Sequence, residues 1–246
     1  MTNYRVDTLE LGTFTTESGA TINNLKLRYE HVGYSGQPLV VVCHALTGNH
    51  LTYGTDEKHG WWREIIDGGY IPRHDYQFLT FNVIGSPFGS SSKLNDPNFP
   101  QHLTLRDIVK AIEKGIKALG FEKINILIGA SLGGMQAMEL LYNNQFQIDK
   151  AINLATTGET SSYSRAFNEI ARQAIHLGGK EGLSIARQLG FLTYRSSKSY
   201  DQRFTPDEVV TYQQYQGNKF KKNFDLQCYL TLLDVLDSHN IDRGRD

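Results

Sequence analysis

Short apolar runs, separated by polar and glycine-containing segments, recur through the first 154 residues of the chain. Each run is four to seven residues long, a length typical of β-strands. Residues 39–43 and 124–128 are almost continuously apolar, which is typical of strands buried on both faces of a parallel sheet. The pattern predicts strands at residues 25–31, 39–43, 78–82, 124–129 and 151–154, and an additional antiparallel edge within residues 4–14.

Helical spacing of apolar positions fills the gaps between these strands. Thr104 and Asp107 fit a capping box, four apolar residues follow at helical spacing, and Gly120 provides a C-terminal stop. These features predict a helix over residues 105–119, and the pattern of residues 131–142 predicts another. Alternating strands and helices predict an α/β fold with a mostly parallel sheet.

The pattern changes after about residue 157. Residues 162–239 show helical periodicity and no strand signal, and Thr205 followed by Pro206 is a favourable helix start. We therefore predict two parts: residues 1–158 as the N-terminal part of an α/β core, and residues 159–246 as a helical lid. An ordinary helical tail is the alternative, but an insertion after a buried strand favours a lid over a site.

Composition and charge narrow the class of protein. The chain has 246 residues, 25 Lys and Arg, and 26 Asp and Glu, which argues against a nucleic-acid binder. No apolar run is long enough for a membrane helix, and the first ten residues do not resemble a signal peptide. Cys43 and Cys228 provide no disulfide framework, and the eight histidines show no metal-ligand spacing. We expect a cytoplasmic protein without a metal.

A G-x-S-x-G motif carries the strongest chemical signal. It spans residues 129–133, directly follows a predicted buried strand and opens a predicted helix, which is the context of a nucleophile elbow. Such a turn would expose the Ser131 hydroxyl at the helix N-terminus, where developing negative charge is favoured. We therefore predict Ser131 as a catalytic nucleophile and the Leu132 N–H as one oxyanion-hole donor.

The second oxyanion donor is expected from a loop after an early strand. Residues 44–48, His-Ala-Leu-Thr-Gly, follow the strand at 39–43 and fit this requirement. We predict the Leu46 N–H as the second donor. The alternative is that this stretch only shapes a turn.

Several short motifs together resemble the homoserine O-acetyltransferase family of α/β-hydrolase-fold acyltransferases. The motifs are Cys-His-Ala-Leu-Thr-Gly (43–48), Gly-Trp-Trp (60–62), Phe-Asn-Val-Ile-Gly (81–85), Leu-Arg-Asp (105–107) and Ser-Leu-Gly-Gly-Met-Gln-Ala (131–137). Residues 165–169, 186–188 and 239–245 match as well, so the resemblance covers nearly the whole chain.

The resemblance implies an activity and its partners. Ser131 would accept an acetyl group from acetyl-CoA, a co-substrate, and pass it to L-homoserine for methionine synthesis, without a resident cofactor. Arg187 corresponds to the family's arginine for the substrate carboxylate, although a surface arginine on an amphipathic helix is the alternative, and Arg195 is a second candidate. The family also suggests a homodimer through the lid helices.

Departures from the family pattern leave other functions open. The elbow reads Gly-Ala-Ser-Leu where Gly-Gly-Ser-Met is common, and residues 82–89 also differ, which leaves acetyl and succinyl donors open. An esterase of the same fold is one alternative.

The rest of the catalytic triad has no candidate in this chain. In this fold the acid and the base follow the serine on later strand loops, and neither His176 nor His239 has that context. We therefore expect a C-terminally truncated member that lacks its last core strands, its acid and its base. Such a chain should be weakly active and marginally stable, with an exposed sheet edge, and a non-catalytic fragment is a further alternative.

Overall fold

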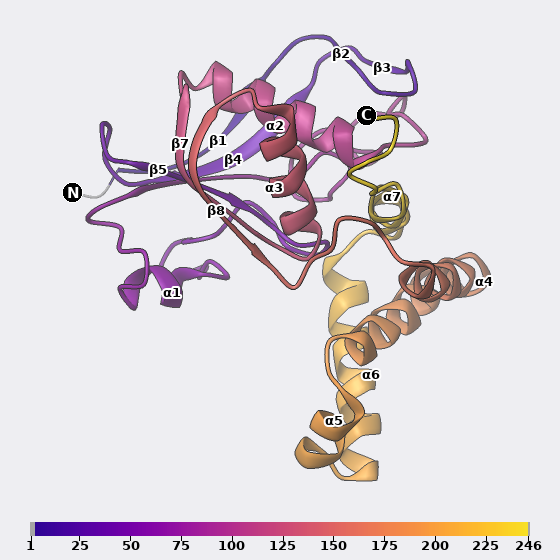
Figure 1. Ribbon diagram of the computed structural model, residues 1–246. Helices are drawn as coiled ribbons and strands as arrows, with labels where there is room; N and C mark the ends of the chain where they lie inside the picture. Colours follow the sequence, from indigo (N-terminus) through magenta and orange to yellow (C-terminus); the bar gives the residue numbers. More distant parts are fainter. Residues whose placement is uncertain (1–2, 246) are drawn as a thin grey trace.

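A six-stranded sheet lies at the centre of the computed structural model, which describes residues 3–245 (Figure 1). Its strands are arranged in the order β1 (Tyr4–Glu10), β4 (Lys26–Val32), β6 (Gln77–Phe81), β5 (Leu39–Cys43), β7 (Lys123–Ala130) and β8 (Gln147–Leu154). A separate two-stranded ribbon pairs β2 (Phe14–Thr15) with β3 (Thr21–Ile22).

The pairing directions bring the C-terminal ends of the central strands together. β6, β5, β7 and β8 are mutually parallel, whereas β4 is antiparallel to β6 and β1 is antiparallel to β4. Within the β5–β7 pair, Cys43 lies opposite Gly129. The loop after β5 and the turn after β7 therefore begin side by side at one edge of the sheet.

Helices cover both faces of this sheet. On one face, α2 (Leu105–Ala118) and α3 (Leu132–Asn143) pack over the strands, and α1 (Arg63–Asp67) lies on the other (Figure 1). Alternation along β5 explains the two layers: Val41 and Cys43 belong to the large core under α2 and α3, whereas Val40 and Val42 belong to the smaller core with Ile66 of α1.

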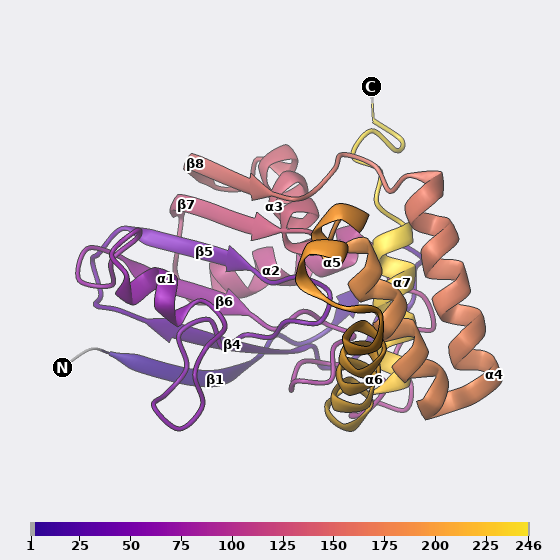
Figure 2. The ribbon, with the colours of Figure 1, turned by 90° about the horizontal axis from the view of Figure 1, so that it is seen from below.

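Four helices follow the sheet: α4 (Ser162–Thr193), α5 (Ser197–Arg203), α6 (Pro206–Asn223) and α7 (Leu226–Asp237). They lie beyond the C-terminal ends of the parallel strands (Figure 2). The helix α4 bends at Gly179, which has φ 54° and ψ −122°, so that it consists of two helical arms. Buried residues of α4 and α7 are continuous with the large core of the sheet.

Most predicted elements are confirmed, with differences at their ends. The capping boxes at Thr104 and Thr205 are present, and β1 forms the expected antiparallel edge. The strand β8 begins four residues earlier than residue 151, because its first half is polar and exposed and so lacks an apolar signal. Ser131 is the residue before α3 rather than its first residue. The short α1 was not predicted.

Among residues 3–245, no helix is long and apolar enough to span a membrane.

Candidate active site

Ser131 occupies a sharp turn between β7 and α3. Its φ of 55° and ψ of −124° lie in a region that residues with a side chain seldom adopt. Its N–H donates to the Leu154 carbonyl at 3.0 Å, and the Thr156 hydroxyl donates to the Ser131 carbonyl at 2.9 Å. The side chain is exposed. A nucleophile elbow has this geometry: surrounding hydrogen bonds hold the serine backbone in a strained conformation, and the hydroxyl remains accessible.

Two glycines make this turn sterically possible. A Cβ on Gly129 would lie 2.1 Å from the Gly133 carbonyl oxygen, and a Cβ on Gly133 would lie 2.0 Å from the Cys43 carbonyl oxygen. Real carbon atoms do not approach so closely, so any side chain would push α3 away from β5 and β7. The two glycines of the motif therefore set the position of Ser131 relative to the loop after β5.

A buried histidine shapes the loop after β5. The His44 Nδ1–H donates to the Ala45 carbonyl at 2.8 Å, while Nε2 accepts the Val83 N–H at 3.1 Å. Burial lowers the pKa of His44 to about 4, so the ring is neutral near pH 7. From α3, the Gln136 amide donates to the His44 carbonyl at 3.1 Å. This loop is thus joined to the helix that starts at Ser131.

The two predicted oxyanion donors lie on these adjoining segments. Leu132 is the first residue of α3, where a backbone N–H has no acceptor inside the helix. Leu46 lies in the loop that His44 shapes, and its N–H donates no hydrogen bond to any part of residues 3–245. Both N–H groups therefore remain available to a ligand, and their catalytic role stays a prediction.

Arg187 reaches from α4 to the loop after β5. Its Nη1 is 3.3 Å from the Thr47 hydroxyl and 3.4 Å from the Tyr194 hydroxyl. The guanidinium carbon lies 4.5 Å from the ring centre of Phe191 and 4.8 Å from that of Phe220. No carboxylate of the described chain forms an ion pair with it.

These contacts give Arg187 a fixed position above the loop after β5, with its charge uncompensated. A guanidinium in this state can bind the carboxylate of a ligand through two hydrogen bonds. Tyr194 was not identified from the sequence; it directly follows the last residue of α4, seven positions or about two helical turns after Arg187. Helical spacing was therefore the signal that could have identified it.

Neither downstream histidine is placed to act on Ser131. His239 is buried, and its Nε2 lies 2.9 Å from the Thr157 carbonyl oxygen, where it joins the exit of the helical region to its entry. His176 is exposed on α4. In the described part of the chain, no histidine is hydrogen-bonded to Ser131, and no group of three or more His, Cys, Asp or Glu side chains could hold a metal ion.

Comparison with known proteins gives consistent results. The alpha/beta hydrolase fold family matches residues 38–177. The homoserine O-acetyltransferase of Moorella thermoacetica is 32% identical, over 93% of this chain and 73% of its own length. The crystal structure of homoserine O-acetyltransferase from Staphylococcus aureus shares 84% identity with a TM-score of 0.96, covering 99% of this chain and 75% of that one. Esterase E22 shares 19% identity with a TM-score of 0.78, which shows the fold alone.

Proposed function

The chain belongs to the homoserine O-acetyltransferase family, and we propose that it transfers an acetyl group from acetyl-CoA to L-homoserine through an acetylated Ser131. The family's reaction serves methionine biosynthesis. The observation that carries the proposal is the strained, exposed Ser131 at the start of α3, beside a loop with a free N–H. Acetyl-CoA acts as a co-substrate, and the mechanism uses no resident cofactor.

The first step is acetylation of the enzyme. The Ser131 oxygen attacks the thioester carbon, and the negative charge that develops on the carbonyl oxygen is stabilised by the N–H groups of Leu46 and Leu132. The C–S bond then breaks, an acetyl ester of Ser131 forms, and the serine proton leaves with CoA as the thiol. The N-terminal end of the α3 dipole favours the same negative charge.

The second step transfers the acetyl group to the acceptor. The homoserine hydroxyl attacks the ester carbon, the ester bond to Ser131 breaks, and O-acetyl-L-homoserine leaves while the serine oxygen regains a proton. Arg187 holds the acceptor's carboxylate, and this role is supported by its position over the loop after β5 and its unpaired charge. An acceptor fixed in this way reacts in preference to water.

Ser131 needs a base to become a strong nucleophile. Because no histidine of the described chain is bonded to it, we expect residues 1–246 by themselves to be acetylated slowly. Loss of a triad member lowers turnover by about four to six orders of magnitude in well-studied serine hydrolases. This expectation concerns rate, not the identity of the nucleophile.

We propose that two copies of the chain form a homodimer through the helical region. The proposed location is the cytoplasm. The support for the dimer is a row of exposed apolar side chains on the first arm of α4, spaced seven residues apart: Tyr163, Ile170 and Leu177, hereafter the α4 stripe. Leu177 is 90% exposed. An apolar row at helical spacing is the surface by which helices of two copies pack together.

Intact-mass spectrometry after prolonged incubation with acetyl-CoA tests the nucleophile. The wild-type chain should gain one acetyl group, located on Ser131 by peptide mapping, and S131A should gain none. Adding L-homoserine should remove the adduct with formation of O-acetyl-L-homoserine, and R187K should require about tenfold more homoserine for the same rate. An adduct lost equally fast to water would identify an esterase, and no adduct in either protein would identify a non-catalytic chain.

A further inference from the structure

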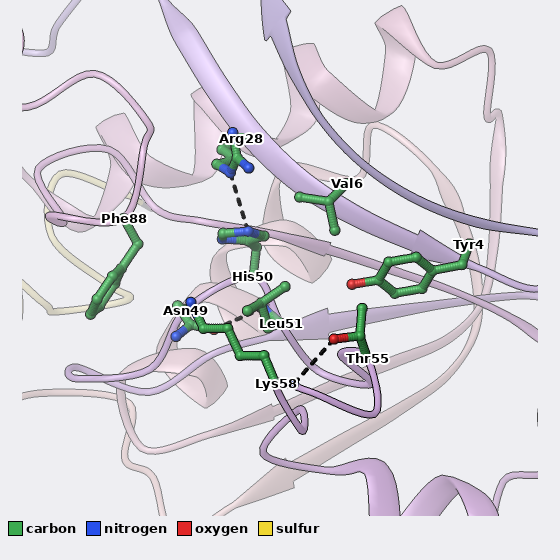
Figure 3. A pocket seen from close by; sticks show the side chains of 9 residues that line it. All are labelled: Tyr4, Val6, Arg28, Asn49, His50, Leu51, Thr55, Lys58 and Phe88. Carbon is green, nitrogen blue, oxygen red and sulfur yellow. Dashed lines mark hydrogen bonds between the residues drawn. The ribbon is translucent and has the colours of Figure 1, made fainter.

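A cavity lies on the α1 face of the sheet, and Ser131 is not among the residues that line it. It has a volume of ≈ 330 Å³ and is bounded by β1, β4 and the chain segments after β5 and β6 (Figure 3). Its polar lining comes from Arg28 of β4 and from Asn49, His50 and Lys58 of the segment after β5. Phe88 provides an aromatic wall. Nothing in the acetyl-transfer mechanism uses this cavity.

The cavity is positively charged. Arg28 and Lys58 line it, and no carboxylate does. Within residues 3–245, neither cation forms an ion pair with a carboxylate. The buried Glu30, on the same face of β4, instead accepts the backbone N–H groups of Tyr53 and Gly54, both at 2.8 Å. Asp7 interacts with Arg28 at longer range, but two cations without a close ion pair around one cavity favour an anionic ligand.

The Arg28 side chain is held in place rather than free in solvent. Its Nε donates to His50 Nε2 at 3.3 Å (Figure 3). Its Nη1 donates to the Thr8 hydroxyl at 3.4 Å. Its stem lies against Gly89, where a Cβ would be 2.5 Å from Arg28 Cδ. Because residue 89 is a glycine, the loop after β6 leaves room for the stem of Arg28. Gly89 also has φ 104°, a backbone conformation that favours glycine. An arginine positioned before a ligand arrives loses less entropy on binding.

His50 is neutral and accepts a hydrogen bond from Arg28, so it positions the guanidinium without adding a charge of its own. The ring is 6% exposed, and its Nδ1 has no hydrogen-bond partner in the described chain. Burial, followed by the charge of Arg28, lowers the pKa of His50 to about 3. The ring is therefore neutral near pH 7, with Nε2 as the acceptor for Arg28. The positive charge of the cavity is concentrated on Arg28 and Lys58.

We propose that this cavity is a binding site for a phosphate group, held by the Arg28 guanidinium, the Lys58 ammonium and the Asn49 amide. A guanidinium fork and a lysine point charge are the side chains by which proteins bind phosphate. The phosphate comes either from the nucleotide end of acetyl-CoA, a source that rests on the proposed function, or from a free phosphate ion in the role of an effector.

The location connects this site to the active site by two routes. Asn49 and His50 directly follow the loop of residues 44–48, which carries Leu46. Phe88 packs edge to face on Phe224, between α6 and α7, with ring centres 5.6 Å apart. A bound phosphate would therefore contact both the segment that carries an oxyanion donor and a residue in contact with the lid.

Isothermal titration calorimetry tests the site with three probes: inorganic pyrophosphate, CoA, and pantetheine, which has the thiol arm of CoA without phosphate. Each probe is titrated into the wild type, R28Q, K58Q and the control K110Q. Lys110 is exposed on α2, on the opposite face of the sheet, so its substitution removes the same charge elsewhere. Circular dichroism first establishes which variants fold. R28K, which keeps the charge but loses the fork, is titrated in place of R28Q if R28Q does not fold, and it should show the same loss for pyrophosphate. Lys58 is exposed, so K58Q changes a side chain outside the core.

The expected result is that pyrophosphate binds the wild type and K110Q equally, and binds R28Q and K58Q about tenfold more weakly, the effect of losing one charged hydrogen-bond partner. The same losses for CoA, with pantetheine unaffected, would identify the co-substrate as the source of the phosphate. Losses for pyrophosphate alone would identify a free anion. Equal binding of pyrophosphate to all variants, or none to the wild type, would overturn the proposal. The pyrophosphate result requires no acyl chemistry, so it stands or fails independently of acetyl transfer.

Discussion

Gly133 determines the active-site geometry as directly as Ser131 does. Its missing side chain lets α3 start against the carbonyl of Cys43, and this contact fixes where the Ser131 hydroxyl lies relative to the loop after β5. Gly178 offers a contrast within α4, since a Cβ there would meet nothing closer than 4.0 Å. The same substitution at the two sites therefore separates the effect of close packing at Gly133 from the general effect of replacing glycine by alanine.

We predict that G133A lowers the free energy of unfolding by about 3 kcal/mol, because the new methyl group overlaps backbone atoms in a closely packed contact. The control G178A, at the end of the first arm of α4, should change it by less than about 0.5 kcal/mol, since its methyl group would meet nothing closer than 4.0 Å. Urea unfolding monitored by circular dichroism measures both values. A G133A protein as stable as the wild type would contradict the steric account of the elbow.

Buried neutral histidines make stability depend on pH. Burial lowers the pKa of His44 to about 4 and that of His50 to about 3, whereas a histidine in the unfolded chain titrates at about 6.5. Below pH 6.5 the unfolded state binds protons that the folded state does not. The stabilisation is therefore complete above pH 6.5 and is lost as the pH falls toward 4.

We predict that the free energy of unfolding declines steadily between pH 6.5 and 4.5, and that H44Q shows a shallower decline. Urea titrations at half-unit pH steps provide the measurement. A constant free energy of unfolding across this range in the wild type would mean that neither ring is buried in its neutral form.

Among the elements, those with a local signal were predicted and those defined by distant contacts were not. The strands β5 and β7 are buried on both faces, so their apolar runs are nearly continuous, and Thr104 caps α2 through neighbours in the sequence. The first half of β8 is polar because it lies on an edge, where exposure overrides the apolar pattern of a strand. The bend of α4 at Gly179 does have a local signal, the Gly-Gly pair at 178–179, which a search for helical periodicity alone does not use.

The same distinction applies to the site. The motif around Ser131 and the loop at residues 44–48 are each contiguous in sequence, so both were found from the chain alone. The contact between Arg187 and Thr47 joins residues 140 positions apart and depends on how α4 lies over the sheet. Only the family resemblance indicated Arg187 from the sequence, because an arginine on an amphipathic helix carries no signal of its own.

The α4 stripe provides a test of assembly. We predict that the double variant I170D/L177D is monomeric, because two carboxylates in a helix–helix contact would be buried without partners. V210D on α6, where Val210 is 54% exposed, is the matched control and should behave as the wild type. Sedimentation velocity distinguishes the two states. A wild-type chain that sediments as a monomer would refute the proposed dimer.

At the scale of the whole molecule, the sheet ends in an edge that is open along its length. Most residues of β8 are exposed, among them Ile152 at 37% and Leu154 at 44%. On the opposite edge, β1 has mostly half-buried residues and includes charged side chains. An exposed strand with apolar side chains pairs readily with other chains, so β8 is the expected site of aggregation at high concentration, separate from the dimer contact proposed on α4.

We predict that I152K increases the soluble fraction of the protein at high concentration and reduces light scattering on storage, because an edge lysine opposes pairing with another strand. The control is L94K, a substitution of a loop residue that is 55% exposed and lies outside the sheet. Equal scattering by I152K and the wild type would exclude β8 as the site of association.

The pairing of β5 with β7 has a consequence for refolding. These strands are separated in sequence by β6 and α2, and the elbow exists only after they have paired and α3 has packed beside them. Contacts between distant segments form slowly, whereas helices form early. During refolding, the far-ultraviolet helical signal should therefore recover before Ser131 becomes reactive, which makes acylation of this serine a late kinetic marker of the native state.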